Sequence, residues 1–400
     1  MQKIYDSIII GGGASGLLCA VELLNGDNHF KGEDVLILER NDRVGKKLIA
    51  TGNGQGNLMN ENFGADFYYG DRAFIDQFIE LEKQIDLKKY LVDLGIYQTS
   101  GSDGKTYPLS KQASAVLDLL RAFLVYKNCQ ILTNKKVDKI SKNNDLFEVY
   151  VGTEKYLAKT VVVGAGGSAG KHFGTDGSAY SLVEKFGHKK TALYPSLVQL
   201  KTQTNQIKGL KGLKERAKVS SYSKDKLLMT AEGDLLFTDY GVSGSAIFSL
   251  SASVADKEGA YLVVEFLPNL SLSQVEQIIK DRQSKPYINQ EDLLSSVLNK
   301  KIGQQVLKSA KSLKPSDVAY AIKNFKLNVL GSLDFSYAQV TRGGIKTDKI
   351  DAKTYQSKIV KGLYIVGEML DVDGDCGGYN LTFAFVSGIV SAKSIKGVLN

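Results

Sequence analysis

A glycine-rich segment near the start of the chain has the residue types and spacing of a dinucleotide-binding turn. Gly11–Gly16 reads Gly-Gly-Gly-Ala-Ser-Gly, which fits G-x-G-x-x-G, and it lies between the apolar run Tyr5–Ile10 and an apolar helical pattern at 17–24. Such glycines permit a tight turn, the approach of a pyrophosphate and close packing of helix on strand. Glu39 ends the next apolar run, 23 positions after Gly16, where a carboxylate binds ribose hydroxyls and repels a 2′-phosphate. The segment therefore predicts a dinucleotide, other than NADP, at a helix N-terminus.

Further glycine-rich segments follow along the chain. Residues 43–70 lack periodicity and are rich in Gly and Asn, which indicates a binding loop. The apolar run Thr160–Val163 opens into Gly164-Ala-Gly-Gly, which also scans as a second fingerprint, Gly164-x-Gly166-x-x-Ala169. That fingerprint would indicate a separate nicotinamide site, although no clear helix and acid-ended strand follow it. Gly367–Asn380 ends the last apolar run and opens the final helix, whose N-terminal amides would stabilise negative charge.

Two polar groups near the C-terminal end leave alternatives open. Arg342, in Thr341-Arg-Gly-Gly, has the character to orient an anionic or carbonyl group, but pairing with a surface acid is an equal alternative. Asp371, Asp373 and Asp375 alternate as in a calcium loop, but the glutamate of an EF-hand does not follow at the required spacing. We therefore expect no metal site.

The composition restricts the class of protein. With 43% hydrophobic and 24% charged residues over 400 positions, the chain is not globally disordered. Three widely separated Cys argue against a disulfide framework, and three His are too few for a His-rich metal cage. No apolar stretch approaches the length of a membrane span, so we expect a cytoplasmic protein. The net charge of +8 comes mostly from scattered lysines, which indicates a solvated surface rather than a nucleic-acid groove.

The elements that must position these segments change in character along the chain. Strand, turn, helix and strand occupy the first forty residues, and alternating segments after about residue 191 read as antiparallel strands of a small barrel, with a turn at Glu232–Asp234. Helical patterns follow Pro268, including segments at 291–300 and 303–311, and a strand-like stretch at 334–340 leads back. The sequence thus predicts an α/β nucleotide-binding domain with an insertion.

Segments spread over nearly the whole chain resemble the HI0933-like flavoproteins, a family that includes aminoacetone oxidases and bacterial bile-acid enone reductases. The acidic and glycine-rich segment at 367–380 is the most specific of them, and the nearest resemblance within the family is to the bacterial aminoacetone oxidases. The matching segments are Val35–Gly45 with Lys46 and Lys47, Thr51–Asn57, Val161–Gly167, Gly174–Ser178, Phe237–Gly244 and Gly367–Asn380.

The resemblance implies a Rossmann-like FAD-binding domain of the glutathione-reductase type, interrupted by an antiparallel β-barrel-like domain and a small helical domain. We expect the FAD-binding domain at 1–190 and 341–400, the barrel-like substrate domain at 191–268 and 326–340, and the helical insertion at 269–325. The residues expected to hold FAD are Gly11, Gly13, Ala14, Ser15, Gly16, Glu39, Arg40, Lys47, Gly52, Asn57, Val137, Ala165, Gly166, Gly167, Asp176, Gly367, Glu368, Asp373, Gly378, Tyr379, Asn380 and Leu381.

Arg342, Tyr379 and Asp239 are the candidate catalytic residues. The chain departs from the family pattern at two places. It has Gln55-Gly56 where many members have Arg-Cys, and Asp239 where many have His. Both segments are expected near the reactive face of the flavin. The substrate of any one relative therefore does not transfer directly to this chain.

The resemblance favours an oxidase that deaminates a small amine or aminoketone, or an amino acid, with O₂ as electron acceptor, giving H₂O₂, ammonia and a carbonyl product. The alternative is an NAD(P)H-dependent flavin reductase of an enone, and a more distant one is an RNA-binding or tRNA-modifying flavoprotein, motivated by the +8 charge. A FAD-binding protein without turnover is a further alternative. We expect a small-molecule substrate, neither nucleic acid nor membrane as partner, and a monomer or homodimer.

Overall fold

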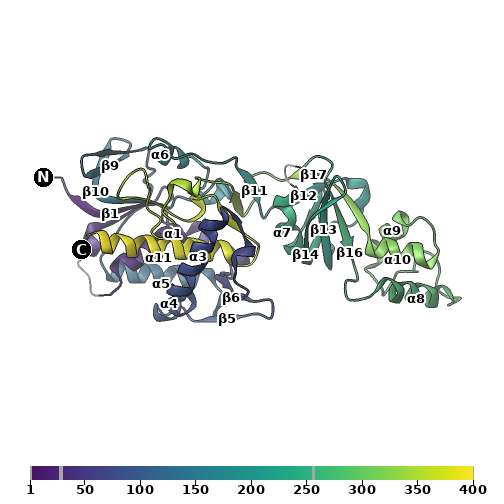
Figure 1. The fold of residues 1–400 in the computed structure, drawn as a ribbon. Helices are drawn as coiled ribbons and strands as arrows, with labels where there is room; N and C mark the ends of the chain where they lie inside the picture. Colours follow the sequence, from purple (N-terminus) through teal and green to yellow (C-terminus); the bar gives the residue numbers. More distant parts are fainter. Residues whose placement is uncertain (1, 27–29, 255–256, 400) are drawn as a thin grey trace. The chain divides into compact units, whose positions relative to one another are not determined.

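The computed structural model describes residues 2–26, 30–254 and 257–399, which form two compact units (Figure 1). The first unit comprises Met1–Tyr194 and Val340–Asn400, and the second comprises Pro195–Gln339. The chain leaves the first unit after one long segment and returns to it for the last sixty residues. The second unit is thus an insertion in the first.

A seven-stranded sheet forms the centre of the first unit. Its five parallel strands pair through largely apolar stretches, such as residues 35–38 and 161–163, as expected in a parallel sheet whose faces are covered. Two further strands extend the sheet in antiparallel fashion beyond β10. In chain order the strands are β1 (Ile4–Ile10), β2 (Val35–Leu38), β7 (Gln130–Leu132), β8 (Lys139–Asn143), β9 (Leu146–Val151), β10 (Glu154–Val163) and β19 (Leu363–Ile365).

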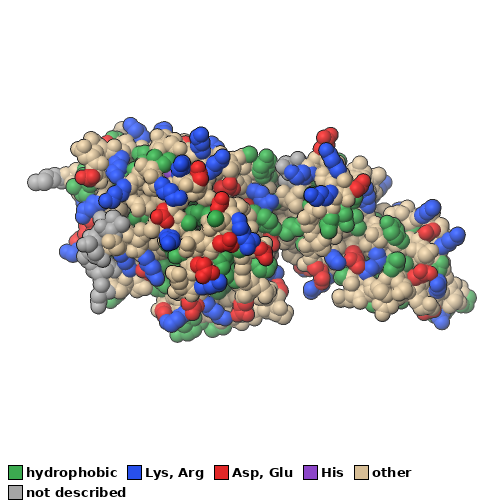
Figure 2. All heavy atoms as spheres, in the orientation of Figure 1, with side chains coloured by type: hydrophobic (Ala, Val, Ile, Leu, Met, Phe, Trp, Pro, Cys, Tyr) green, Lys and Arg blue, Asp and Glu red, His purple; other side chains and the backbone are tan. Residues whose placement is uncertain are grey.

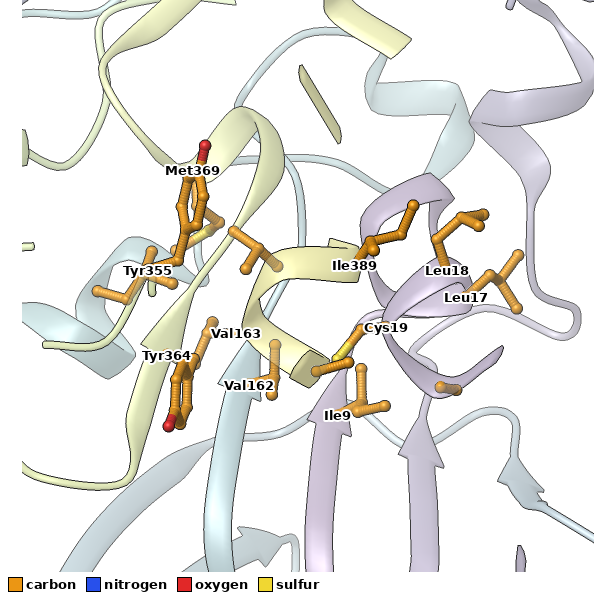
Figure 3. Close-up of a cluster of buried hydrophobic side chains, with 14 of the residues drawn as sticks. Ile9, Leu17, Leu18, Cys19, Val162, Val163, Tyr355, Tyr364, Met369 and Ile389 are labelled. Carbon is orange, nitrogen blue, oxygen red and sulfur yellow. The ribbon is translucent and has the colours of Figure 1, made fainter. Parts of the chain in front are cut away.

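Two helices pack side by side against this sheet, α1 (Ala14–Leu24) and α11 (Tyr379–Leu399). Figure 3 shows Leu17, Leu18 and Cys19 of α1 and Ile389 of α11 over Ile9, Val162 and Val163 of the sheet. A Cβ atom at Gly388 would lie 2.2 Å from the backbone oxygen of Ser15, so the two helix backbones approach closely there. The start of α1 is therefore held against the middle of α11.

The remaining elements of the first unit are short. Four further helices are α2 (Lys46–Ile49), α3 (Arg72–Ile85), α4 (Leu87–Asp93) and α5 (Ala113–Tyr126), followed by α6 (Tyr180–Glu184). The short strands are β3 (Met59–Asn60), β4 (Tyr68–Gly70), β5 (Gln98–Ser100), β6 (Lys105–Pro108), β18 (Val340–Arg342) and β20 (Val372–Gly374), with β11 (Tyr194–Ser196) where the chain leaves the unit. Turns of 3₁₀ helix lie at Gly32–Asp34, Thr51–Gly54, Ala65–Phe67, Lys171–Phe173, Thr347–Lys349 and Gly367–Met369.

A closed antiparallel barrel of six strands forms one part of the second unit. Its order is β12-β15-β14-β13-β16-β17, and α7 (Ser245–Val254), which the sequence patterns did not predict, packs on β13 and β14. The strands are β12 (Leu200–Thr202), β13 (Lys214–Ser223), β14 (Lys226–Phe237), β15 (Gly241–Ser243), β16 (Tyr261–Glu265) and β17 (Phe325–Ser332), with a 3₁₀ turn at Thr204–Ile207.

Two predictions about the barrel strands are wrong. The turn predicted at Glu232–Asp234 lies inside β14, because β13 is long enough to pair with it from Lys226 to Leu236 and holds Glu232 opposite Lys218. The strand predicted at 334–340 is a turn over its first residues, since the Asp334 side chain accepts a hydrogen bond from the N–H of Ser336. The strand that returns the chain is β17, which lies earlier.

Three helices form the other part of the second unit, α8 (Leu272–Gln283), α9 (Lys300–Ser309) and α10 (Pro315–Lys323). The helix predicted at 291–300 is wrong, because that segment forms turns. Arg282 donates to the carbonyl oxygens of Asp292 and Leu293, which a helix would use for its own hydrogen bonds. Buried residues of the barrel and of these helices belong to one hydrophobic cluster. Their division into separate domains at 268 and 326 stays a prediction.

The architecture confirms the predicted class, an α/β domain of Rossmann type with an inserted antiparallel barrel. Over residues 2–26, 30–254 and 257–399, every helix is too short or too polar to cross a bilayer.

Candidate functional site

The first glycine turn joins β1 to α1 and leaves the start of this helix open. The N–H of Gly11 donates to the carbonyl of Leu38, which ties the turn to β2. No side chain caps the first turn of α1, which also contains no acidic residue, within the part of the chain that the structure describes. A Cβ atom at Gly13 would meet only the carbonyl oxygen of Gly164, at 4.0 Å. Uncapped N–H groups beside open space fit the pyrophosphate of a dinucleotide.

Glu39, the acid at the end of β2, is buried and organises the turn. One carboxylate oxygen accepts a hydrogen bond from the N–H of Gly12 at 2.8 Å. The other accepts two from Asn41, from its backbone N–H at 2.8 Å and its side-chain amide at 2.7 Å. A carboxylate has about four acceptor positions, so Glu39 retains capacity for a ribose hydroxyl, as the sequence predicts.

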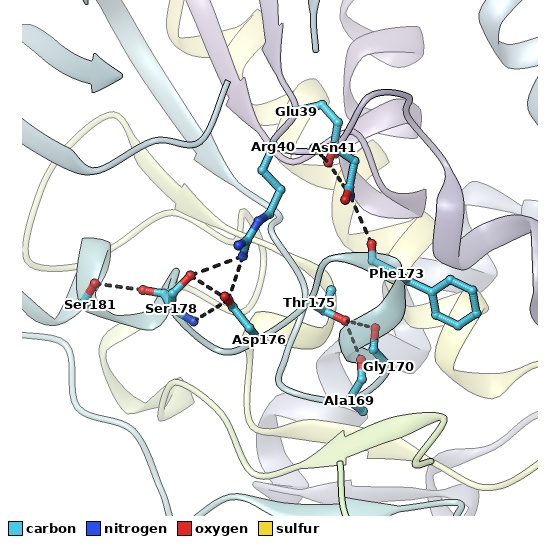
Figure 4. Close-up of polar contacts among 10 residues, drawn as sticks. All are labelled: Glu39, Arg40, Asn41, Ala169, Gly170, Phe173, Thr175, Asp176, Ser178 and Ser181. Carbon is cyan, nitrogen blue, oxygen red and sulfur yellow. Dashed lines mark hydrogen bonds and ion pairs between the residues drawn. The ribbon is translucent and has the colours of Figure 1, made fainter. Parts of the chain in front are cut away.

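An ion pair connects the end of β2 with the loop at 170–178 (Figure 4). Arg40 contacts Asp176 at 2.7 Å, and Asp176 also accepts hydrogen bonds from the backbone N–H and hydroxyl of Ser178. Partial burial opposes ionisation of Asp176, but the hydrogen bonds from Arg40 and Ser178 prevail and hold its pKa below the ordinary value. Asn41 donates to the carbonyl of Phe173 in the same loop. Two segments predicted to bind FAD are thus fastened together.

A second polar junction gathers residues from four segments around Glu368. Lys47 of α2 forms an ion pair with Glu368 at 2.6 Å and donates to the carbonyl of Ala169. The other carboxylate oxygen of Glu368 accepts from the N–H of Thr341 at 2.9 Å. The Thr341 hydroxyl in turn accepts from the backbone N–H groups of Ser168 and Ala169. Glu368, predicted to bind the ribityl chain, therefore first positions the loops around it.

The loop after β10 lies directly beside the first glycine turn. The N–H of Gly164 donates to the carbonyl of Ile10, and a Cβ atom at Gly11 would lie 2.8 Å from the Cα of Ala165. Gly166 and Gly167 continue this loop toward Thr341, and Val137 is buried in the core of the same unit. A 3₁₀ turn, Lys171–Phe173, follows instead of a long helix. The second fingerprint thus lacks the helix that a separate nicotinamide site requires.

The start of α11 is held by side chains from other predicted FAD-binding segments. In the orientation that satisfies both of its neighbours, the Asn57 amide donates to the Met59 carbonyl and accepts from the N–H of Gly378, both at 3.2 Å. Asn380 donates to and accepts from the backbone of Gly374. Gly52 lies beside Asn57, Gly367 lies beside Ser15, and Leu381 packs on the core.

Tyr379 is a packing residue in this arrangement. Its ring stacks on Phe67 with centroids 4.7 Å apart, and its hydroxyl donates to the carbonyl of Asn62 at 2.9 Å. Asp239 lies in the second unit between β14 and β15, where its exposed carboxylate pairs with Lys211 at 2.8 Å. Gln55 is exposed. The catalytic roles of Tyr379 and Asp239 stay predictions, and the contacts of both residues are those of structural side chains.

Arg342 lies in a cluster of four polar residues, Tyr69, Arg342, Asp373 and Asp375, here called the Arg342 cluster. Its Nε donates to both carboxylate oxygens of Asp373, at 3.2 and 3.1 Å, and its guanidinium lies 4.2 Å from the centre of the Tyr69 ring. The Tyr69 hydroxyl donates to Asp375 at 2.9 Å. Arg342 thus pairs with Asp373, which is buried. The sequence leaves open a role in orienting a substrate group or a pair with a surface acid, and a pair with a buried acid is neither of these.

Sequence reasoning missed three residues of this region, Asn41, Tyr69 and Thr341. Each acts through a contact with a segment distant in the sequence, such as the 2.8 Å bond from Ser168 to Thr341. Thr341 directly precedes the Arg342-Gly-Gly sequence, so its position in the chain indicates a residue near the site. Tyr69 lies in a segment without periodicity, which gives no such indication.

Comparison with known proteins agrees with this geometry. The family model described as the HI0933-like protein Rossmann domain matches residues 5–394. A 3-dehydro-bile acid delta(4,6)-reductase of Clostridium scindens is 33% identical, over 96% of this chain and 98% of that protein. A ribosomal RNA dihydrouridine synthase of Haemophilus influenzae is 25% identical, over 99% of this chain and 100% of that protein.

Among solved structures, a 3-ketosteroid-delta4-(5alpha)-dehydrogenase of Rhodococcus jostii has a similar fold, with a TM-score of 0.51 and 13% identity over 99% of this chain and 98% of that one. This likeness concerns the fold alone. The family match covers nearly the whole chain, and the glycine turns, Glu39 and the open start of α1 fit its cofactor. The chain belongs to the HI0933-like family and is an FAD-binding oxidoreductase.

Proposed function

We propose that this protein reduces a carbon–carbon double bond conjugated to a carbonyl group, with electrons that a nicotinamide nucleotide supplies to FAD. The observation that carries the proposal is the 33% identity with a 3-dehydro-bile acid delta(4,6)-reductase along 96% of the chain. A match over 96% of the chain extends through both units, which supports a common scaffold for the two proteins.

The two relatives share one kind of chemistry although their substrates differ. A delta(4,6)-reductase of a 3-dehydro bile acid saturates double bonds in conjugation with the 3-carbonyl. Dihydrouridine differs from uridine by saturation of a ring double bond that is likewise conjugated to a carbonyl. Support for the proposal thus comes also from the relative that is 25% identical over 99% of the chain.

Arg342 is suited to the carbonyl end of such a substrate. Only its Nε donates a hydrogen bond to another described residue, so both terminal NH₂ groups are available to an external oxygen. The pair with Asp373, 3% exposed, fixes the plane of the guanidinium. Reduction of a conjugated double bond places negative charge on the carbonyl oxygen, and a preorganised cation stabilises that charge. Bound FAD, once reduced by the nicotinamide nucleotide, would supply the hydride.

The amine-oxidase prediction, with O₂ as acceptor, receives no support from these relatives and stays a prediction. The experiment below also tests whether the substrate is a small enone or a uridine of RNA. Figure 2 shows Lys and Arg side chains scattered among Asp and Glu over the visible face, and a scattered distribution favours a small molecule over a polyanion.

The test is an anaerobic stopped-flow comparison with purified, FAD-loaded protein. NADH and NADPH are first tried as reductants, and the reduced protein is then mixed with 2-cyclohexen-1-one, 4-androstene-3,17-dione or uridine. Rapid return of the oxidised flavin spectrum, with a saturated ketone among the products, is the expected result. The proposal would be refuted if aminoacetone reduced the flavin, the reduced flavin released peroxide in air, and none of the conjugated carbonyl compounds reoxidised it.

A further inference from the structure

The Tyr69–Asp375 pair has the features of a proton-transfer group that no sequence pattern indicated. The Tyr69 hydroxyl and a carboxylate oxygen of Asp375 are 2.9 Å apart. Tyr69 is half-buried, and its ring lies against the guanidinium of Arg342. The Tyr69 side chain is thus held against the cation to which we assign the carbonyl oxygen.

The short sheet of β4 and β20 explains why these side chains meet. Tyr69 pairs with Asp373 across the two strands, and the N–H of Asp375 donates to the carbonyl of Phe67. Side chains alternate along a strand. Tyr68 therefore faces the core, where it is 5% exposed, while Tyr69 faces the opposite side with Arg342.

The acids of the Arg342 cluster differ in how their charge is balanced. Asp373 receives the ion pair from Arg342. In the described part of the chain, no cation lies within ion-pair distance of the Asp375 carboxylate, whose side-chain partner is the Tyr69 hydroxyl. Burial raises the pKa of Asp375 above its ordinary value, although the Tyr69 hydrogen bond and Arg342 act in the opposite direction. A carboxyl group in this setting retains a proton at higher pH than a solvated one.

We propose that Tyr69 is the acid that protonates the substrate carbon next to the carbonyl, and that Asp375 positions Tyr69 and restores its proton. The inference rests on the proposed function. The Tyr69 O–H bond breaks as the new C–H bond forms, and the electron pair of the enolate, generated by hydride addition from reduced flavin, makes that bond. The proton of the Asp375 carboxyl group then returns to Tyr69, and solvent returns one to Asp375.

The charged and titratable groups around this pair come from two strands, a loop and a helix. Burial raises the pKa of Tyr69, the charge of Asp375 raises it further, and Arg342 lowers it. The groups facing the pair are Arg342 from β18, Asp373 from β20, Cys376 from the following loop and Tyr379 from α11.

The experiment separates hydride transfer from protonation with two probes. Protein loaded with FAD and reduced is mixed with 2-cyclohexen-1-one, which needs a proton to give product, or with 1-nitrocyclohexene, whose nitronate forms by hydride addition alone. We expect Tyr69→Phe to reduce the cyclohexenone about 10²- to 10⁴-fold more slowly. It should add hydride to the nitroalkene at the wild-type rate and release the nitronate, which the wild type converts to the nitroalkane. Tyr126→Phe, at an exposed tyrosine of α5 (79% exposed), is the matched control.

A second measurement follows Tyr69 without turnover. Protein labelled with 3-fluorotyrosine shows one ¹⁹F resonance that disappears in Tyr69→Phe, which assigns it. In Asp375→Asn this resonance should titrate at lower pH than in the wild type, because the neighbouring negative charge is removed. Asp375→Asn should also protonate the nitronate more slowly while hydride addition is unchanged.

The outcomes distinguish the two proposals. If the wild type reduces neither probe, the proposed function fails and the role of Tyr69 fails with it. If the wild type reduces both and Tyr69→Phe protonates the nitronate as fast, only the role of Tyr69 is overturned. If the Tyr69 resonance titrates identically in Asp375→Asn, the assigned role of Asp375 is overturned.

Discussion

Two glycines of the first turn should respond to alanine in opposite ways, although they lie three positions apart. Gly13 has φ −84° and ψ −170°, an extended conformation that alanine adopts, and its Cβ position is open except for Gly164 oxygen at 4.0 Å. At Gly16 a Cβ atom would lie 2.0 Å from the backbone oxygen of Gly11. The first methyl group would occupy the space assigned to FAD, and the second would collide with the protein itself.

The magnitudes follow from these contacts. Gly13→Ala should leave the FAD-free protein as stable as the wild type or more stable by about 0.4–1 kcal/mol, because alanine restricts the unfolded chain. Overpacking against the pyrophosphate costs about 1–3 kcal/mol, which weakens FAD binding roughly 5- to 150-fold. Gly16→Ala should destabilise the FAD-free protein by at least about 1–3 kcal/mol, since α1 must move away from β1.

Urea unfolding of the FAD-free proteins measures the first quantity, and quenching of FAD fluorescence on titration with protein measures the second. The wild type and Gly26→Ala, at a surface glycine with no atom within 4 Å of its Cβ position, provide the references. Gly26 has φ +79°, so this variant carries backbone strain without touching the turn. Wild-type FAD affinity in Gly13→Ala, or equal loss of stability in Gly13→Ala and Gly16→Ala, would refute the reasoning.

Three further predictions concern charged groups. In a double-mutant cycle with Lys47→Met and Glu368→Gln, urea unfolding should give a coupling free energy of about 1–3 kcal/mol, and additive effects would contradict the role of the pair. Asp176→Asn should destabilise the protein most at pH 6 and progressively less as the pH falls below about 4, with a smaller effect near pH 2. Because the pKa of Asp176 is lowered on folding, its contribution exists above the unfolded-state pKa of about 3.9 and disappears as pH falls through the folded value, which unfolding at both pH values tests. Arg342→Lys should lower kcat for enone reduction about 10-fold or more with a smaller change in KM, since lysine lacks the planar fork; steady-state kinetics will show whether KM alone changes.

The sequence predicted the parts of the site that depend on backbone geometry. The glycine spacing of Gly11–Gly16, followed by Glu39, is specific for a tight strand–turn–helix unit. The strand β2, Val35–Leu38, has the bounds that its apolar run predicts. The parallel strands can likewise be predicted from the sequence, because coverage of both faces of the sheet requires apolar residues in succession. Family-level features, the Rossmann-like unit and its inserted barrel, follow from these signals.

The errors arose where tertiary contacts decide the local structure. Glu232–Asp234 contains residues typical of turns, yet β13 pairs across it and keeps it extended. Residues 291–300 have helical composition, but Arg282 captures two carbonyl oxygens there. Tyr69 illustrates the same limit for function, since its partner Asp375 is 306 positions away in the sequence. A single sequence carries no signal for such a pair.

The acids of the segment 368–375 differ in whether a cation pairs with them, and this difference limits which of them can exchange a proton. Glu368 is paired with Lys47, and Asp373 is paired with Arg342. Burial raises the pKa of Asp371 and of Asp375, although Thr191 bonds to the first and Tyr69 to the second. Of these two bonds, the one at Asp375 leads to a phenol, a group that can itself pass a proton on. On the proposal that reduced FAD delivers hydride to a conjugated carbonyl, we therefore assign the proton to the Tyr69–Asp375 pair; an oxidase would need no such donor to carbon.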